Sequence, residues 1–297
     1  MRVEKPEKWH IGVIGGSGLA DGIAMEDAQE IAVSSPFGTP SGPVTTGTIA
    51  GTRFTFIARH GKGHTIPPGK VDYRANVDVL KRCGVTDVVS LSAIGSLREE
   101  MAPGEIVAVD QFIDRTSGRT NSFFGPGLVA HVSLADPTCG RLSSLAADAA
   151  EKAGAKVHRG GCYVAIEGPQ FSTRAESLMY RQWGADVIGM TAMPEARLLR
   201  EAELPYALLG MVTDYDAWRA DEAGVETAEI LEVMHANAKL ARDAIARIAG
   251  LLPDKREPSP IDHALEFALV TASDARDRKL VAMLDAVAGR MLNPPEA

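Results

Sequence analysis

The chain has 297 residues, and its 31 Lys and Arg against 39 Asp and Glu give a formal net charge of −8. Because the basic residues form no cluster, the sequence lacks the electrostatic footprint of a nucleic-acid binder, and we expect no nucleic-acid partner. Hydrophobic residues make up 45% of the chain, which is ordinary globular composition. The sequence has no apolar run of about 18 residues and no apolar signal core at its start, so we expect a soluble, cytoplasmic protein without a membrane partner.

The cysteines and histidines predict neither a disulfide framework nor a metal site. Cys83, Cys139 and Cys162 are odd in number, far apart and without CxxC spacing, so we expect buried free thiols. The two histidines in ARHGKGHT are four residues apart, but the glycines between them disfavour a ligand-bearing helix. We expect no metal.

Short apolar runs alternate along the chain with segments of helical periodicity. The expected strands are 11–14, 54–58, 85–91, 106–109, 163–166, 187–190 and 206–212. The expected helices are 71–83, 138–153, 174–183, 194–203 and 230–248. This alternation predicts an α/β sheet, in which ligands bind at the carboxyl ends of the strands.

The composition changes after residue 252. PDKREPSP is polar and contains three prolines, which is typical of a linker. Ser273 is then placed to cap one last helix with an apolar stripe of Leu280, Leu284, Val287 and Met291. We predict a domain over 10–252, a Pro-rich linker over 253–261 and a helical extension over 262–297 that packs on the body or on a neighbouring subunit.

Three expected strands end in segments suited to bind an anion. GGSGL brings backbone N–H groups and the Ser17 hydroxyl together, ARHGKGHTIPP places Arg59 and His60 among glycines, and LSAIGSL supplies small hydroxyl residues. Each has a simpler interpretation, a tight turn or a solvated basic loop. Together they favour a loop cluster that holds phosphate oxygens.

Later strand ends carry groups suited to a purine base. If the last strand continues through Asp214 and Asp216, their carboxylates share one face and can accept ring and amino N–H groups. Phe171 offers a stacking surface. A turn or helix-cap role for one aspartate, and core packing for Phe171, remain open.

Seven ordered motifs resemble the methylthioadenosine phosphorylases of the trimeric purine nucleoside phosphorylase family: GGSGL, ARHGKGHTIPPGKVDYRANVDVLK, LSAIGSL, PGEIVAVDQFIDRT, IEGPQFSTRAES, MTAMPEA and VTDYDAW. The resemblance covers residues 10–250. It implies one domain with a central mixed β-sheet flanked by helices, a homotrimer with shared active sites, and no cofactor. It also implies a reaction of methionine and purine salvage, in which inorganic phosphate cleaves 5′-methylthioadenosine to adenine and 5-methylthioribose 1-phosphate.

The resemblance also implies a site. Its phosphate-binding residues are Ser17, Arg59, His60, Ser92, Ala93 and Thr191. Its nucleoside-binding residues are Phe171, Ser172, Met190, Asp214 and Asp216. The 5′-methylthio group is enclosed by Thr227, Ile230, Leu231 and, from the adjacent subunit, His131.

The implied chemistry needs a proton for the leaving adenine, and the catalytic residues are expected to be Asp214, Asp216 and His60. We expect Asp214 to be the general acid, with a pKa raised by burial beside Asp216. A carboxylate pair also favours a 6-amino group over a 6-oxo group.

Other functions are weighed against this one. A broader purine nucleoside phosphorylase acting on 5′-deoxyadenosine, adenosine or methylthioinosine stays open. A purine-binding protein without catalysis would need no phosphate cradle. A dinucleotide-dependent oxidoreductase is disfavoured, because the glycine spacing of GGSGL is not G-x-G-x-x-G.

Overall fold

The computed structural model describes residues 8–16, 19–219 and 227–292. Eleven strands of this part form one sheet, with the order β2-β3-β4-β1-β5-β10-β9-β7 and with β11, β6 and β8 branching from β5. The strands are β1 His10–Gly15, β2 Glu26–Ile31, β3 Val44–Ile49, β4 Thr52–Ala58, β5 Asp87–Ser96, β6 Ile106–Val109, β7 Gln111–Arg115, β8 Val157–Arg159, β9 Cys162–Ile166, β10 Val187–Gly189 and β11 Tyr206–Asp214. The helices are α1 Tyr73–Arg82, α2 Gly140–Lys152, α3 Arg174–Gln182, α4 Ala192–Glu201, α5 Thr227–Ala249, α6 Arg278–Met283 and α7 Gly289–Leu292.

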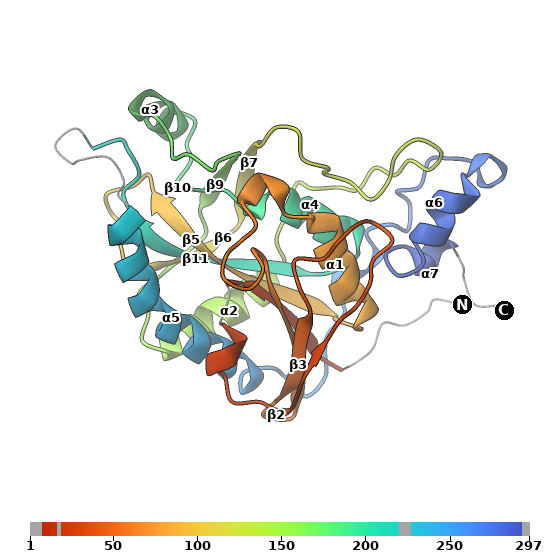
Figure 1. Cartoon of the computed structure of the whole chain (residues 1–297), viewed down its shortest axis with the longest axis horizontal. Helices are drawn as coiled ribbons and strands as arrows, with labels where there is room; N and C mark the ends of the chain where they lie inside the picture. The colour runs from red at the N-terminus through yellow and green to blue at the C-terminus, as the bar shows by residue number, and fades with distance from the viewer. Residues whose placement is uncertain (1–7, 17–18, 220–226, 293–297) are drawn as a thin grey trace.

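The sheet is mixed and lies between two groups of helices (Figure 1). Strand β5 runs parallel to β1 and β11 and antiparallel to β10. One hydrophobic cluster joins α1, α4 and the C-terminal helices, and a second joins α2 and α5. Apolar residues therefore fill both faces of the sheet, and the α/β fold expected from the alternating pattern is confirmed.

Local sequence signals explain where several helices begin and end. Asp72 caps α1, because its carboxylate accepts a hydrogen bond from the Ala75 N–H at 3.1 Å, and Gly84 follows the helix with φ +81°. Thr173 and Glu176 form a capping box at the start of α3. These signals place the helix ends close to the predicted positions.

The prediction that LSAIGSL forms a loop is wrong. Strand β5 continues to Ser96, with Ser92 paired to Gly210 of β11 and Gly95 paired to Ile188 of β10. Small residues are needed here because strands pack closely, and a Cβ at Gly210 would lie 2.3 Å from the Ile94 side chain. Strands β2, β3, β7 and β8 were not predicted, and β2 in particular is exposed along its whole length.

The C-terminal extension packs on the body of the same chain, but not as one helix capped by Ser273. Asp277 caps α6 by accepting the Leu280 N–H at 2.7 Å, and a separate short α7 follows. Leu284 and Val287 lie between these helices and are fully buried in the cluster with α1 and α4. The apolar stripe is therefore real, although the continuous helix is wrong.

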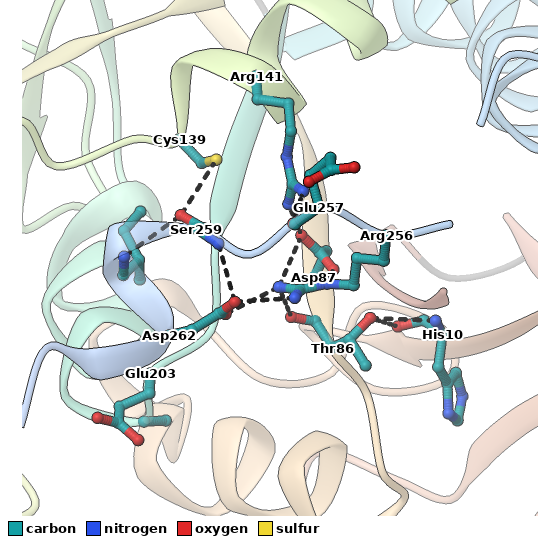
Figure 2. Close-up of polar contacts among 12 residues, drawn as sticks. His10, Thr86, Asp87, Cys139, Arg141, Glu203, Arg256, Glu257, Ser259 and Asp262 are labelled. Atoms are coloured by element: carbon teal, nitrogen blue, oxygen red, sulfur yellow. Dashed lines mark hydrogen bonds and ion pairs between the residues drawn. The ribbon is translucent and has the colours of Figure 1, made fainter. Parts of the chain in front are cut away.

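The segment 253–261 contacts the body through buried side chains, among them Arg256 and Ser259. Arg256 is only 4% exposed, and its guanidinium pairs with Asp87 at the start of β5 and with Asp262, at 2.8 Å from each oxygen of Asp262 (Figure 2). Asp87 also accepts a hydrogen bond from Arg141 of α2 at 2.7 Å. Ser259 caps the short helix η3 Pro260–His263. One charged residue of this linker-like segment, Arg256, is thus an internal ion-pair partner.

The described residues also bear on the expected absences. All three cysteines are free thiols, as expected, but only Cys139 is buried, while Cys83 and Cys162 are half-buried. Within residues 8–16, 19–219 and 227–292 there is no grouping of three His, Cys, Asp or Glu side chains that could hold a metal ion. No helix in this part of the chain is long and apolar enough to span a bilayer.

Candidate active site

Arg59 lies immediately after β4, at the carboxyl end of neighbouring parallel strands. Its backbone N–H donates to the Gly15 carbonyl at the end of β1, at 2.9 Å. Its side chain is 3% exposed and reaches β5, donating from Nη2 to Ser90 Oγ and from Nη1 to the Leu91 carbonyl at 3.2 Å. Arg59, which the sequence marks as a basic residue directly after an apolar strand, therefore joins the three strands β1, β4 and β5.

The guanidinium of Arg59 makes most of its hydrogen bonds to partners within the protein. Glu195 of α4 accepts from Nε at 2.9 Å and from Nη2 at 3.2 Å, and it is 1% exposed. The Tyr206 hydroxyl donates to Glu195 at 2.9 Å. The negative charge of Glu195 raises the pKa of Arg59 against the opposing effect of burial, so the two residues form a buried ion pair.

His60 is a neutral imidazole in this site. Burial and the positive charge of Arg59 lower its pKa to about 4. Its Nδ1 lies 2.8 Å from the Ile66 carbonyl, which can only accept, so Nδ1 carries the proton and Nε2 is left as an acceptor. The ring stacks on His64 with 4.2 Å between centroids.

The hydroxyls of Ser92 and Thr191 meet beside this ion pair. Ser92 lies on β5 directly after Leu91, and its Oγ is 3.1 Å from Thr191 Oγ1 at the start of α4. Both side chains are buried. Ala93 follows on β5, and its carbonyl accepts from Ser92 Oγ at 3.1 Å. Ser17 lies outside the described residues.

Asp214 and Asp216 do not share the face of one strand. Strand β11 ends at Asp214, and Asp216 has φ +50°. Asp214 Oδ1 accepts the Asp216 backbone N–H at 2.8 Å, and Oδ2 lies 2.7 Å from Thr213 Oγ1. A Cβ at Gly95 would lie 3.0 Å from Asp214 Oδ1, so glycine gives both aspartates room beside β5.

Asp216 has a raised carboxyl pKa. Burial and the negative charge of Asp214 raise the pKa of Asp216 to about 6, against the effect of neighbouring hydrogen-bond donors. Its Oδ2 is buried and has no hydrogen-bond partner among the described residues. Asp216 therefore offers a desolvated oxygen to a ligand N–H group.

Met190 joins the hydroxyl pair to the loop after β9. It precedes Thr191, and a Cβ at Gly168 would lie 2.4 Å from its sulfur, so the Gly168 loop packs directly on it. Phe171 in the same loop region is 44% exposed, which excludes simple core packing in this chain. Ser172 Oγ is buried without a hydrogen-bond partner in the part of the chain that the structure describes.

Arg119 is a residue of this region that the sequence did not single out. Its Nη1 donates to the Met190 carbonyl at 2.7 Å and to the Met193 carbonyl at 2.8 Å, and its Nη2 donates to the Glu167 carbonyl at 2.7 Å. Its Nε pairs with the Glu167 carboxylate at 3.0 Å. One guanidinium thus ties the end of β9 to the end of β10. No sequence motif marks Arg119. Glu195 is part of the motif MTAMPEA, but the motif indicates no role for it.

Three of the residues expected around the 5′ group belong to α5, and the fourth, His131, is expected to come from a neighbouring subunit. His131 is exposed, and its backbone N–H donates to the Ala268 carbonyl of the C-terminal extension at 2.9 Å. Thr227, Ile230 and Leu231 lie in the first turns of α5, and their side chains are outside the described residues.

Two known proteins with similar sequences carry the same name. The S-methyl-5′-thioadenosine phosphorylase of Cereibacter sphaeroides is 55% identical over 287 residues, covering 96% of this chain and 99% of its own length. The enzyme of that name from Bradyrhizobium diazoefficiens is 54% identical over 284 residues, covering 95% and 98%.

Two solved structures that resemble this fold are also methylthioadenosine phosphorylases. A methylthioadenosine phosphorylase from an Antarctic soil metagenomic library has a TM-score of 0.89 at 42% identity, covering 95% of this chain and 99% of that one. Methylthioadenosine phosphorylase from Schistosoma mansoni, in complex with tubercidin, has a TM-score of 0.76 at 36% identity, covering 82% and 91%. The model of the phosphorylase superfamily matches residues 10–249, and the chain belongs to that superfamily, among relatives that are S-methyl-5′-thioadenosine phosphorylases.

Proposed function

We propose that the chain catalyses the phosphorolysis of 5′-methylthioadenosine to adenine and 5-methylthioribose 1-phosphate. The observation that carries this function is the junction at residues 190–191. Thr191 contributes its hydroxyl to the cluster with Ser92 and Arg59, while Met190 packs on the loop that leads to Phe171. Two adjacent residues thus join an anion subsite to a nucleoside subsite, as a transfer between phosphate and a nucleoside requires.

In the proposed step, a phosphate oxygen forms a bond to C1′ while the bond from C1′ to adenine N9 breaks. The electron pair of that bond goes to the purine, which takes up a proton at N7. We assign this proton to the Asp214–Asp216 pair. Support comes from the raised pKa of Asp216, which keeps a proton available near neutral pH.

The same pair favours adenine over 6-oxopurines. The buried Oδ2 of Asp216 is an acceptor that a 6-amino group can satisfy and a 6-oxo group cannot. Because the phosphate, the hydroxyls and the carboxyl pair supply every charge and proton in this step, we propose that the enzyme needs no metal or organic cofactor.

We further propose a homotrimer in which His131 enters the site of a neighbouring subunit. A cyclic trimer uses two different surface patches on each subunit. One apolar patch surrounds α3 and contains Phe171, Leu178 and Trp183. The other surrounds His131 and contains Val129, Val270 and Phe267, which is 93% exposed.

In a closed trimer, the patch around α3 of one subunit contacts the patch around His131 of the next. Val270 donates its backbone N–H to the Val129 carbonyl at 3.0 Å, so the second patch joins two chain segments. Helix α3 and the C-terminal helices lie toward opposite ends of the long axis (Figure 1). A Phe267→Asp variant should sediment as a monomer and lose activity, whereas a monomeric wild-type protein would overturn the trimer. The free thiols support our proposal of a cytoplasmic location.

The test of function is adenine release from 5′-methylthioadenosine with and without inorganic phosphate. Methylthioinosine, 5′-deoxyadenosine and adenosine are assayed at equal concentrations. We expect phosphate-dependent release that is fastest for methylthioadenosine. Release without phosphate would make the protein a hydrolase, and no release from any nucleoside would favour a purine-binding protein.

A further inference from the structure

We propose that Glu195 is a positioning residue that weakens and orients phosphate binding by cancelling the charge of Arg59. The proposal rests on the proposed function, because it concerns the same phosphate site. Glu195 is a buried acidic residue beside a proposed anion site, where a negative charge is unfavourable for binding.

The ion pair leaves Arg59 little capacity for a ligand. A guanidinium has five N–H groups. Nε and one N–H of Nη2 go to Glu195, the second N–H of Nη2 goes to Ser90, and one N–H of Nη1 goes to the Leu91 carbonyl. A single N–H of Nη1 remains. Phosphate therefore meets Arg59 from one direction, set by Glu195 and β5.

Glu195 is held in place by its hydrogen-bond partners Arg59 and Tyr206. It is 1% exposed, so its carboxylate has no access to bulk water and depends on Arg59 and Tyr206. Burial raises the pKa of Tyr206 well above its usual value, so this hydroxyl remains a donor to Glu195 at every pH of interest. The carboxylate thus stays paired with Arg59 whether or not phosphate is bound.

The cancelled charge has a consequence for affinity. A phosphate dianion near Arg59 interacts with an ion pair of no net charge, because the Glu195 carboxylate repels the dianion while Arg59 attracts it. Removing one negative charge from a buried position beside an anion site strengthens anion binding on the order of tenfold. A weaker hold suits catalysis, because phosphate must leave this site as part of the sugar product.

The test compares Glu195→Gln with the wild type. Isothermal titration with inorganic phosphate, without nucleoside, gives Kd, and steady-state kinetics give the KM for phosphate and for methylthioadenosine. We expect Kd and KM for phosphate to fall about tenfold in Glu195→Gln, with the KM for methylthioadenosine within about twofold of the wild type. A folded variant that binds phosphate equally well or more weakly overturns the proposal.

The matched control is Glu201→Gln, the same substitution at the other end of α4. Glu201 is also buried, but it pairs with Ser122 and with the Phe123 N–H instead of with Arg59. Its phosphate Kd should equal that of the wild type. An equal gain in affinity in both variants would overturn a specific role for Glu195.

A second variant decides the question if Glu195→Gln does not fold. Glu195→Asp keeps the charge but withdraws it by one methylene, so phosphate should bind more tightly than in the wild type and less tightly than in the uncharged case. Unchanged or weaker binding overturns the proposal. Failure of the proposed function is distinguishable, because then the wild type itself shows no phosphate-dependent adenine release.

Discussion

Asp214 Oδ1 accepts the backbone N–H of Asp216 at 2.8 Å, so the first carboxylate of the pair fixes the backbone that carries the second. The left-handed backbone of Asp216, with φ +50°, directs its chain away from the line of β11. The two aspartates therefore act as a unit in which one residue holds the geometry and the other has the perturbed pKa.

The Asp214→Asn variant should lose most phosphorolysis. The amide keeps the size of the side chain but cannot share a proton with Asp216, and a positioned general acid contributes about 10² to 10⁴ in rate. The measurement is kcat on methylthioadenosine at saturating phosphate, with circular dichroism to confirm folding. Unchanged turnover would remove Asp214 from the proton transfer.

The Asp216→Asn variant should be more stable than the wild type at neutral pH. Because the pKa of Asp216 rises from 3.8 to about 6 on folding, the folded state holds this proton more tightly, and stability falls as pH rises from about 4 through 6. At pH values above 6 the penalty is about 3 kcal/mol, which the neutral amide avoids.

Thermal unfolding at several pH values tests this prediction. The variant should have a Tm several degrees above that of the wild type in neutral buffer, and most of the gain should disappear near pH 4.5. A gain that is independent of pH, or a loss of stability in neutral buffer, would contradict the assignment. Preference for methylthioadenosine over methylthioinosine should fall in the same variant, because an amide can donate to a 6-oxo group.

Replacement of Arg119 should affect nucleoside binding. Arg119→Met removes the donors that hold the Met190 and Glu167 carbonyls, so we expect the KM for methylthioadenosine to rise at least tenfold, as for loss of a group with several charge-assisted bonds. Guanidinium added in solution should restore part of the activity. Arg82→Met is the control, since Arg82 pairs with Asp78 and Asp285 at the end of α1. An equal effect in both variants would refute a specific role for Arg119.

Loss of Arg256 should destabilise the fold. Arg256→Met leaves Asp87 and Asp262 buried without their shared cation, and breaking a buried pair typically costs about 3–5 kcal/mol. Arg159→Met is the matched control, because Arg159 also pairs with two carboxylates, Asp148 and Glu151, but at the surface. That variant should lose much less stability, because an exposed ion pair contributes little. Denaturant unfolding of both proteins measures the difference.

The sequence predicted residues that are marked by their immediate neighbours along the chain. Arg59 and His60 follow an apolar strand and stand among glycines, so a strand end with basic groups could be predicted from a short window. The capping residues Asp72 and Thr173 are likewise local signals. The α/β class followed from periodicity, which is also a local property.

Partners that are distant along the chain could not be predicted in this way. The pairing of Arg59 with Glu195 spans 136 positions, and Arg119 reaches Met190 across 71. Small polar residues caused the error at Ser92–Ser96, because the same letters that suit a loop also allow close approach in the middle of a sheet. The positive φ of Asp216 likewise depends on Asp214 and Gly95, and no propensity for a single residue indicates it.

The pairing of Asp87 with Arg256 has a consequence for the order in which the chain is made. The two residues are 169 positions apart, and Asp87 is fully buried in the central strand β5. During synthesis the strand emerges from the ribosome long before its cation does. Until Arg256 follows, Asp87 has only Arg141 as a described cationic partner. Synthesis of the segment around Arg256 therefore completes the electrostatics of the strand that also carries Ser92.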